Sequence, residues 1–337
     1  MQTINRLAAI IVFIVSSTSG SLAAESGHVQ VVRAYITNYK DNGVSVIDTS
    51  QSRIIGHIET GAKPHGVAIA PNGKAVYVSN EGDGTLSVID PGSNRVVASI
   101  TVGERPNQIA VSGDSRHVLV TLNGSNTVAV VDVAAGKVSK VVPVGRAPHI
   151  ALFSPDGKRA YVTSEGDMKL VALDARTWEV LSEVPLFGWP RVLTVSSDGR
   201  TAYQTLRWLN GVLVLDLQQH KAVDRIAFEM PDFASEGKDA HGPALTPDGH
   251  ELWLTTQTSD DVAVIRTSDR KLLQRIPVGD DPNWIAFTPD GGQAVVSNTG
   301  SNSISIVDVA RRKVTATLPV GQAPKRLAVG FVTVSDR

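Results

Sequence analysis

The chain contains no cysteine in its 337 residues. This absence excludes disulfide bonds, a thiolate nucleophile, thiolate metal ligands and a lipid-anchored amino-terminal cysteine. Packing and hydrogen bonds alone must therefore hold the fold together, and apolar residues make up 42% of the chain, enough for a sizeable core.

Net charge is also nearly absent, at −1 for the whole chain. No global positive field would draw the protein to nucleic acid or to anionic lipid, so a nucleic-acid partner is disfavoured. The sequence also lacks a G-x-S-x-G elbow, a phosphate-cradling glycine loop, an H-E-x-x-H pair and a C-x-x-C-H haem attachment site. The sequence therefore contains none of these standard motifs from which a reaction could be predicted.

Long apolar runs are missing except near the amino terminus. Residues 7–15 are almost wholly apolar, Arg6 precedes them, and small residues at Ser21 and Ala23 fit a cleavage site. We expect residues 1–24 to be a signal peptide that directs a periplasmic or secreted protein, the alternative being a buried first helix. No later stretch is long enough to span a membrane after cleavage.

What the sequence has in abundance is an internal repeat. The segment Pro64–Gly73 recurs from Pro106, Pro148, Pro190, Ala240, Pro282 and Pro324, and successive starts are 42, 42, 42, 50, 42 and 42 residues apart. Each repeat contains four short runs, rich in β-branched residues and separated by turn residues, with no helical periodicity. Four strands per repeat of about this length indicate blades of a β-propeller.

The predicted fold is all-β: a single domain over residues 25–337 forms a seven-bladed propeller of four-stranded antiparallel blades. The chain begins with a second, a third and a fourth strand (about 31–36, 43–48 and 53–59) and finishes with a lone first strand at 326–332. We therefore expect the C-terminal strand to join the N-terminal blade and close the ring, which would remove two sheet edges. We also expect a monomer.

The second strand of every repeat carries a Thr or Ser two residues after its aromatic or apolar opening. The seven are Thr37, Ser79, Thr121, Thr163, Thr205, Thr255 and Ser297. Together with Tyr77-Val78-Ser79-Asn80 and Tyr161-Val162-Thr163-Ser164, they make the chain resemble the YVTN family of seven-bladed propellers. The resemblance covers roughly residues 30–335. It implies secreted or periplasmic proteins, some similar to the haem d1 domain of nitrite reductase and some associated with quinone-dependent alcohol catabolism.

Unusual residues gather on one predicted face, here called the top face, which holds the fourth-to-first and second-to-third loops. The opposite face, with the short turns, is the bottom face. The residue after the repeat proline, here called the ring position, is polar in all seven copies: His65, Asn107, His149, Arg191, His241, Asn283 and Lys325.

Three histidines at the ring position match the ligand set of an open zinc or copper site. Glu81 and Glu165, in neighbouring loops, could then act as acid or base groups. Arg191 and Lys325 instead favour an anionic ligand, and a purely structural role for the ring is the third interpretation. A hydrolytic or oxidative metal enzyme and a binding protein both remain open.

Three tryptophans also fall on predicted top-face positions: Trp189, Trp208 and Trp284. Beside Arg191, Arg207 and Asn283 they suggest a recognition surface, although Trp189 and Trp284 could equally fill gaps between blades. The step of 50 residues adds a top-face loop over residues 229–241, which is either a lid or a tolerated insertion.

The sequence thus predicts a binding or scaffold protein whose top-face funnel holds a small anionic ligand or a periplasmic protein partner, in a role accessory to a redox system. The funnel residues are Asn107, Arg191, Asn283, Lys325, Trp189, Trp208 and Trp284. The alternative is a copper- or zinc-dependent enzyme that uses His65, His149 and His241.

Overall fold

A computed structural model describes residues 27–229 and 239–336. The predicted signal peptide, residues 1–24, and most of the predicted insertion loop lie outside these residues. The described residues include no helix that is long and apolar enough to cross a membrane.

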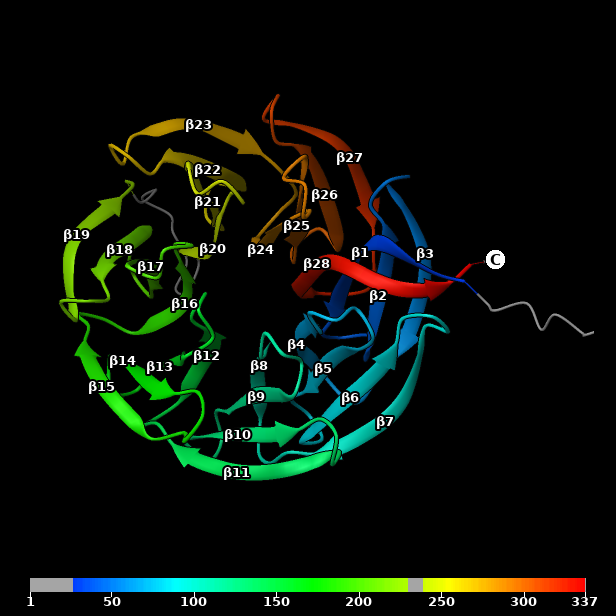
Figure 1. Ribbon diagram of the computed structural model, residues 1–337. Helices are drawn as coiled ribbons and strands as arrows, with labels where there is room; N and C mark the ends of the chain where they lie inside the picture. The colour runs from blue at the N-terminus through cyan, green and yellow to red at the C-terminus, as the bar shows by residue number, and fades with distance from the viewer. Residues whose placement is uncertain (1–26, 230–238, 337) are drawn as a thin grey trace, which may run out of the picture.

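The described residues form 28 strands, arranged as seven four-stranded antiparallel sheets around one central axis (Figure 1). The predicted seven-bladed propeller is confirmed. The innermost strands are β4 (Pro64–Ile69), β8 (Pro106–Val111), β12 (Pro148–Phe153), β16 (Pro190–Val195), β20 (Ala240–Leu245), β24 (Pro282–Phe287) and β28 (Pro324–Ser335). The second strands are β1 (His28–Asn38), β5 (Val76–Asn80), β9 (His117–Leu122), β13 (Arg159–Ser164), β17 (Thr201–Leu206), β21 (Glu251–Thr256) and β25 (Gln293–Asn298).

The outer half of each blade continues the same order. The third strands are β2 (Gly43–Asp48), β6 (Thr85–Asp90), β10 (Thr127–Asp132), β14 (Lys169–Asp174), β18 (Gly211–Asp216), β22 (Asp261–Arg266) and β26 (Ser303–Asp308). The outermost strands are β3 (Arg53–Glu59), β7 (Arg95–Thr101), β11 (Lys137–Pro143), β15 (Val180–Pro185), β19 (Lys221–Ala227), β23 (Leu272–Pro277) and β27 (Lys313–Pro319).

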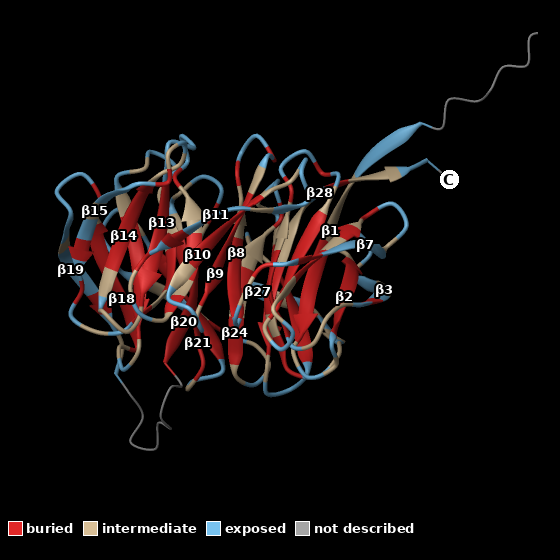
Figure 2. Ribbon diagram, turned by 90° about the horizontal axis from the view of Figure 1, so that it is seen from below, coloured by how far each residue is buried: buried red, intermediate tan, exposed pale blue. Residues whose placement is uncertain are grey.

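The core lies between neighbouring blades. Strand β5 is buried along its whole length, whereas β7 of the same blade is almost wholly exposed (Figure 2). Tyr77 and Leu86 of one blade pack against Val118 and Val120 of the next. Because both faces of each sheet meet another blade, the middle strands read as nearly continuous apolar runs.

Ring closure follows the predicted scheme. The sheet that contains both termini has the strand order β28-β1-β2-β3. Strands β28 and β1 are longer than predicted and pair from His28↔Ser335 to Asn38↔Pro324. Their free ends extend beyond the bottom face, which points upward in Figure 2. The C-terminal strand therefore completes the N-terminal blade.

The repeated Thr or Ser of the second strand joins each blade to the next. Thr163 Oγ1 accepts a hydrogen bond from the Ile150 N–H of its own blade (3.1 Å) and donates to the Arg191 carbonyl of the next blade (3.2 Å). The donation to the next ring-position carbonyl recurs at Thr37, Ser79, Thr121, Thr205, Thr255 and Ser297. These hydroxyls therefore fix the backbone of the ring position in every blade.

Candidate functional site

The three ring histidines lie near the propeller axis, enclosed by protein. His65 and His241 are 4% and 3% exposed, and the rings of His149 and His241 have centroids 6.3 Å apart. Two of the imidazoles are oriented by backbone carbonyls of the next blade: His149 Nδ1 lies 3.1 Å from the Arg191 oxygen, and His241 Nδ1 lies 2.9 Å from the Asn283 oxygen. His65 Nδ1 is buried and has no partner among the described residues.

A guanidinium group lies among these histidines. Arg326, the residue after ring-position Lys325, is 2% exposed. Its Nη2 lies 3.4 Å from His149 Nε2, and its Nη1 donates to Asn283 Oδ1. Its Cζ lies 4.5 Å from the centroid of the Trp284 ring, in the geometry of a cation–π contact. Arg326 is therefore the central charge of the site.

Burial, and then the charge of Arg326, hold the pKa of each ring histidine well below its ordinary value of 6.5. Both causes disfavour the imidazolium, because it would be poorly hydrated and would face another cation. The three imidazoles are therefore neutral near pH 7, and each presents one N–H donor and one acceptor nitrogen.

The positive charges near the axis lack carboxylate partners. Among the described residues, no carboxylate forms an ion pair with Arg326 or Arg191, and the Nε atoms of both are buried without a hydrogen-bond acceptor. Burial, with the neighbouring guanidinium, lowers the pKa of Arg191 and brings that of Arg326 to about 9. Both remain cationic at neutral pH. Glu165 and Asp239 act on Arg191 from a longer distance, so Arg326 is the guanidinium whose charge is left uncompensated.

Lys325 adds a third cation at the edge of this group. Its Nζ lies 3.9 Å from the centroid of the Tyr39 ring, and the Tyr39 ring in turn meets His65 edge-on at 6.1 Å. Burial, and then the charge of Arg326, lower the pKa of Lys325 to about 8. Lys325 is therefore mostly protonated at neutral pH and can lose its charge in mildly alkaline solution.

The two predicted acid or base residues are each paired with an arginine. Glu165 accepts a hydrogen bond from Arg207 Nε, and Glu81 lies 3.7 Å from Arg105 Nη2. Both carboxyl groups are largely buried, with side chains 14% and 15% exposed. Glu165 also acts on Arg191 and Glu81 on Lys325, so both carboxylates lie around the cationic group. An acid or base role for either stays a prediction.

The geometry does not favour the predicted metal site. Within residues 27–229 and 239–336, no three His, Asp or Glu side chains are grouped as metal ligands would be. A guanidinium beside His149 Nε2 would also repel a cation there. Zinc or copper at His65, His149 and His241 stays a prediction, and the metal content of purified protein tests it.

Both ring-position asparagines are buried. Asn283 orders Arg326 through its side chain and His241 through its carbonyl. Asn107 is 9% exposed, and its Oδ1 has no hydrogen-bond partner among the described residues. Asn283 thus supports the site, and Asn107 offers an unused acceptor near the axis.

The three predicted tryptophans separate into two groups. Trp189 and Trp208 are 43% and 55% exposed, and their loops touch where the Arg207 N–H donates to the Trp189 carbonyl (2.9 Å). Trp284 instead packs against the core clusters of two blade interfaces and against Arg326. Its side chain turns inward and lines the central channel, as the interpretation of Trp284 as a residue that fills gaps between blades expects, and a ligand-binding role for Trp284 stays a prediction.

The sequence analysis missed Arg326. The residue after the ring position is Gly66, Gln108, Ile150, Val192, Gly242, Trp284 and Arg326 in the seven copies, so a single charged residue stands among small, apolar and amide side chains. A single charged residue among seven equivalent positions could have identified Arg326 from the sequence. Polar residues are more numerous at the ring position itself, and the predicted site was therefore restricted to that position.

Two protein families match parts of the chain. The sequence model of the YNCE-like beta-propeller family matches residues 99–244, and that of the cytochrome D1 heme domain matches residues 33–132. No curated protein matches the chain in sequence. The predicted resemblance to propellers related to the haem d1 domain is thereby confirmed.

Solved structures share the propeller architecture. Kuenenia stuttgartiensis hydrazine synthase is 20% identical with a TM-score of 0.71, covering 81% of this chain and 95% of that one. The dihydro-heme d1 dehydrogenase NirN is 18% identical with a TM-score of 0.67, covering 88% of this chain and 74% of that one. The periplasmic gluconolactonase PpgL of Pseudomonas aeruginosa is 22% identical with a TM-score of 0.72, covering 88% of this chain and 98% of that one. Identities this low establish similarity of fold alone.

The described residues near the axis do not fit a haem. His65 and His241 are enclosed by protein, and His149 Nε2 faces the Arg326 guanidinium. An axial ligand needs an accessible lone pair directed at the iron. The ring histidines therefore do not supply the ligand that a haem of this family would need.

Proposed function

We propose that this propeller binds a small organic anion bearing a carboxylate group at the top-face end of its axis. One observation supports this function above all others: the buried guanidinium of Arg326 has no carboxylate partner among the described residues. An unpaired buried charge costs several kcal/mol in a folded protein. A bound anion would offset that cost.

The surrounding groups suit a carboxylate. A guanidinium offers N–H donors in a planar fork that matches two carboxylate oxygens. Arg191 and Lys325 add positive charge nearby, and each lowers the pKa of a ring histidine. The neutral imidazoles add no competing charge, and His65, whose Nδ1 has no partner among the described residues, is the one that can turn an N–H toward the anion. The site thus combines charge with directional hydrogen bonding.

Calorimetric titration of the purified protein tests this proposal, with succinate, citrate and gluconate as probes in a buffer of low ionic strength. Gluconate is included because a structural neighbour is named a periplasmic gluconolactonase. We expect saturable binding of at least one probe, weakened at least tenfold in Arg326→Met, which keeps the length of the side chain and removes its charge.

Arg116→Met is the matched control. Arg116 lies in an exposed turn of the bottom face, and its one ion pair among the described residues is a long contact with Asp114 (4.0 Å). Its replacement should leave binding unchanged. Equal affinity in wild type and Arg326→Met, or no binding of any probe at 10 mM (about the weakest binding worth assigning), would contradict the proposal.

We also infer that the mature protein is exported. The support is the apolar run preceded by Arg6 and followed by Ser21 and Ala23, together with the lack of cysteine. Cell fractionation and amino-terminal sequencing test this inference. We expect a mature chain that begins after Ala23 or Ala24, and an uncleaved cytoplasmic chain would contradict it.

A further inference from the structure

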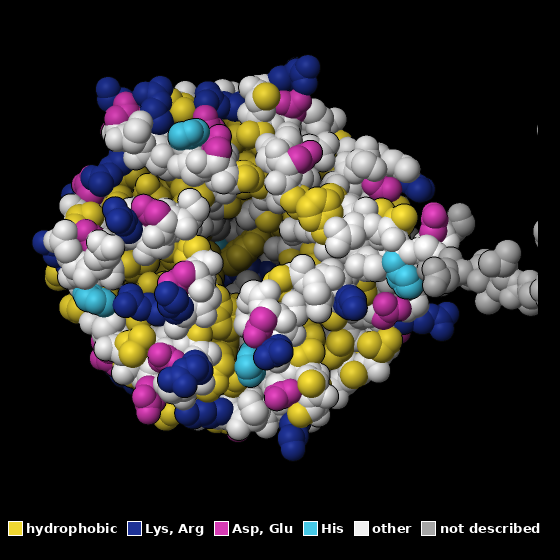
Figure 3. Space-filling view, viewed as in Figure 1, with side chains coloured by type: hydrophobic (Ala, Val, Ile, Leu, Met, Phe, Trp, Pro, Cys, Tyr) yellow, Lys and Arg dark blue, Asp and Glu magenta, His cyan; other side chains and the backbone are white. Residues whose placement is uncertain are grey.

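A separate cavity lies on the other side of Trp284. It occupies the central channel between the innermost strands, has a volume of about 630 Å³, and is reached from the bottom face. Figure 3 looks onto this face and shows the hollow at the centre of the ring, with hydrophobic side chains on its wall. A volume of this size lies in the range of small-molecule sites.

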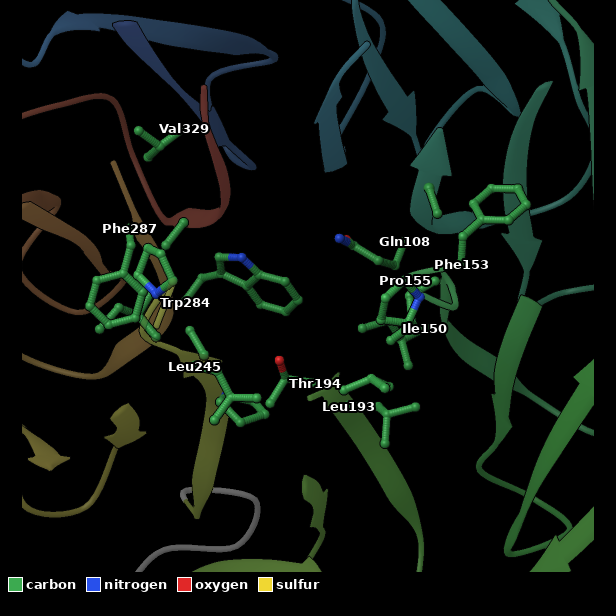
Figure 4. Close-up of a pocket in the computed structure, with 18 of the residues that line it drawn as sticks. Gln108, Ile150, Phe153, Pro155, Leu193, Thr194, Leu245, Trp284, Phe287 and Val329 are labelled. Carbon is green, nitrogen blue, oxygen red and sulfur yellow. The ribbon is translucent and has the colours of Figure 1, made fainter. Parts of the chain in front are cut away.

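The repeat pattern explains why the channel is open. Five of the seven residues at one depth of the innermost strands line the cavity, namely Ala110, Leu152, Thr194, Ala244 and Ala286. The small residues leave the axis unfilled instead of packing it. Ile150, Leu193 and Leu245 supply larger apolar walls (Figure 4). The lining is therefore mainly apolar and is built on rigid strands.

The inner end of the cavity carries polar groups with no partners. Figure 4 shows the Trp284 ring reaching toward the middle of the channel, with Gln108 approaching from the opposite wall. Gln108 is 6% exposed and its Oε1 is buried without a partner. Within the described part of the chain, neither the Gln108 amide nor the Trp284 indole N–H donates a hydrogen bond to protein. Buried polar groups are normally paired, so the unpaired Gln108 amide points to a ligand, and a half-turn of that amide presents either its oxygen or its N–H₂ group to the channel.

Trp284 separates this cavity from the anion site. Arg326 covers one face of its indole at 4.5 Å, and His241 lies beside it with ring centroids 6.4 Å apart. The side that remains free faces the channel. A flat ring could therefore stack on Trp284 from below, while an N–H group of Trp284 or Gln108 donates to an oxygen of the same ligand.

We propose that the channel binds a small neutral aromatic molecule bearing a carbonyl oxygen, entered from the bottom face and independent of the anion site. The apolar walls select an uncharged ring, because no charged side chain lines the cavity to pair with an ionic ligand. The donors at its inner end select the carbonyl oxygen over a plain hydrocarbon.

Acetophenone and ethylbenzene are matched probes, since they are of similar size and shape and differ in the carbonyl oxygen. Ligand-observed NMR titration should show saturable binding of acetophenone in the millimolar range or tighter, as expected for a fragment of this size. Ethylbenzene should bind about 3 to 10 times more weakly, the fold-change of one hydrogen bond. Equal affinities of the two probes would overturn the assignment of the polar groups.

Two variants locate the site. Ala286→Phe fills the channel and should weaken acetophenone binding at least tenfold, while binding of the anion probes persists. Gln108→Leu should remove part of the preference for the ketone. Val97→Ala, in the exposed outermost strand β7, is the control and should change the binding of neither probe. Thermal unfolding of each variant checks that it is folded.

The proposal fails if the wild-type protein does not bind acetophenone saturably, or if a folded Ala286→Phe protein binds it as well as wild type does. Either result can occur with anion binding intact, so this failure is distinguishable from failure of the function proposed for the top-face site.

Discussion

Single side chains decide the charge of the candidate site. Arg326 is buried without a carboxylate partner among the described residues, and its charge lowers the pKa values of neighbouring His65 and Lys325. Lys325 is the neighbour whose charge can change within an accessible pH range. The groups that act on it are Arg326, Glu81, Arg191 and Asp281, with Tyr39 beneath its amine.

We predict that affinity for the anion falls as the pH rises from 7 to 9. Lys325 has a pKa of about 8, so it loses its positive charge across this window, and the loss of one bound proton weakens binding by up to about tenfold per pH unit. Titration calorimetry at several pH values measures the effect. In Lys325→Met the affinity should be lower and should change with pH only close to pH 9, where Arg326, with a pKa of about 9, begins to lose its charge. An unaltered pH dependence in that variant would exclude Lys325 as its source.

We predict that acid destabilises the fold before its carboxylates titrate. His65, His149 and His241 stay neutral in the folded chain below pH 6.5, because their pKa values are lowered there. The unfolded chain binds those protons, so the free energy of unfolding falls with falling pH, by up to about 1.4 kcal/mol per histidine and pH unit.

Denaturant titrations between pH 6.5 and 5, without added multivalent anions, measure this loss. A His241→Gln variant should show about one third less dependence on pH than wild type. A free energy of unfolding that is constant across the window would mean that these imidazoles take up protons in the folded protein.

At the scale of the strand, one Thr or Ser hydroxyl in each blade forms hydrogen bonds both within its own blade and to the next blade. In every blade it donates to the ring-position carbonyl of the next blade, as Thr163 does. In six of the seven blades it also accepts an N–H from its own innermost strand, whereas Thr121 instead donates to the Gln108 carbonyl of that strand. The sequence showed that Thr or Ser recurs in all seven copies, and the structure supplies the reason. The recurrence reflects a contact between blades.

We predict that Thr163→Val lowers the free energy of unfolding by about 1–3 kcal/mol, because the substitution keeps the shape but leaves buried N–H and C=O groups without partners. Thr101→Val, in the exposed outer strand β7, is the control and should change stability by less than about 0.5 kcal/mol. Chemical denaturation compares the two. A Thr163→Val protein as stable as the control would show that the contact contributes nothing measurable.

At the scale of the molecule, the ring is closed by one strand from the far end of the chain. Strand β28 pairs with β1, and the N–H of its Arg326 donates to Thr37 Oγ1 (3.1 Å). The same strand carries Lys325 and Arg326 into the site. Closure and function therefore depend on one element.

We predict that a chain ending at Ala323 does not unfold cooperatively, because the loss of β28 exposes the edge of β1 and opens the ring. A chain ending at Ser335 is the control and should melt as the full chain does. Differential scanning calorimetry distinguishes them. A sharp transition in the shorter chain near the temperature of the control would refute closure as the basis of stability.

The sequence alone determined the propeller, its seven blades and its closure, because each follows from a local pattern repeated at a constant interval. It also located the polar ring position, since a strand that begins at a fixed proline brings equivalent residues to equivalent depths. Only the tertiary structure decided that Arg326 lies among the histidines and that Trp284 turns inward. These two facts depend on which side chains from different blades meet at the axis, and spacing along one chain does not encode those contacts.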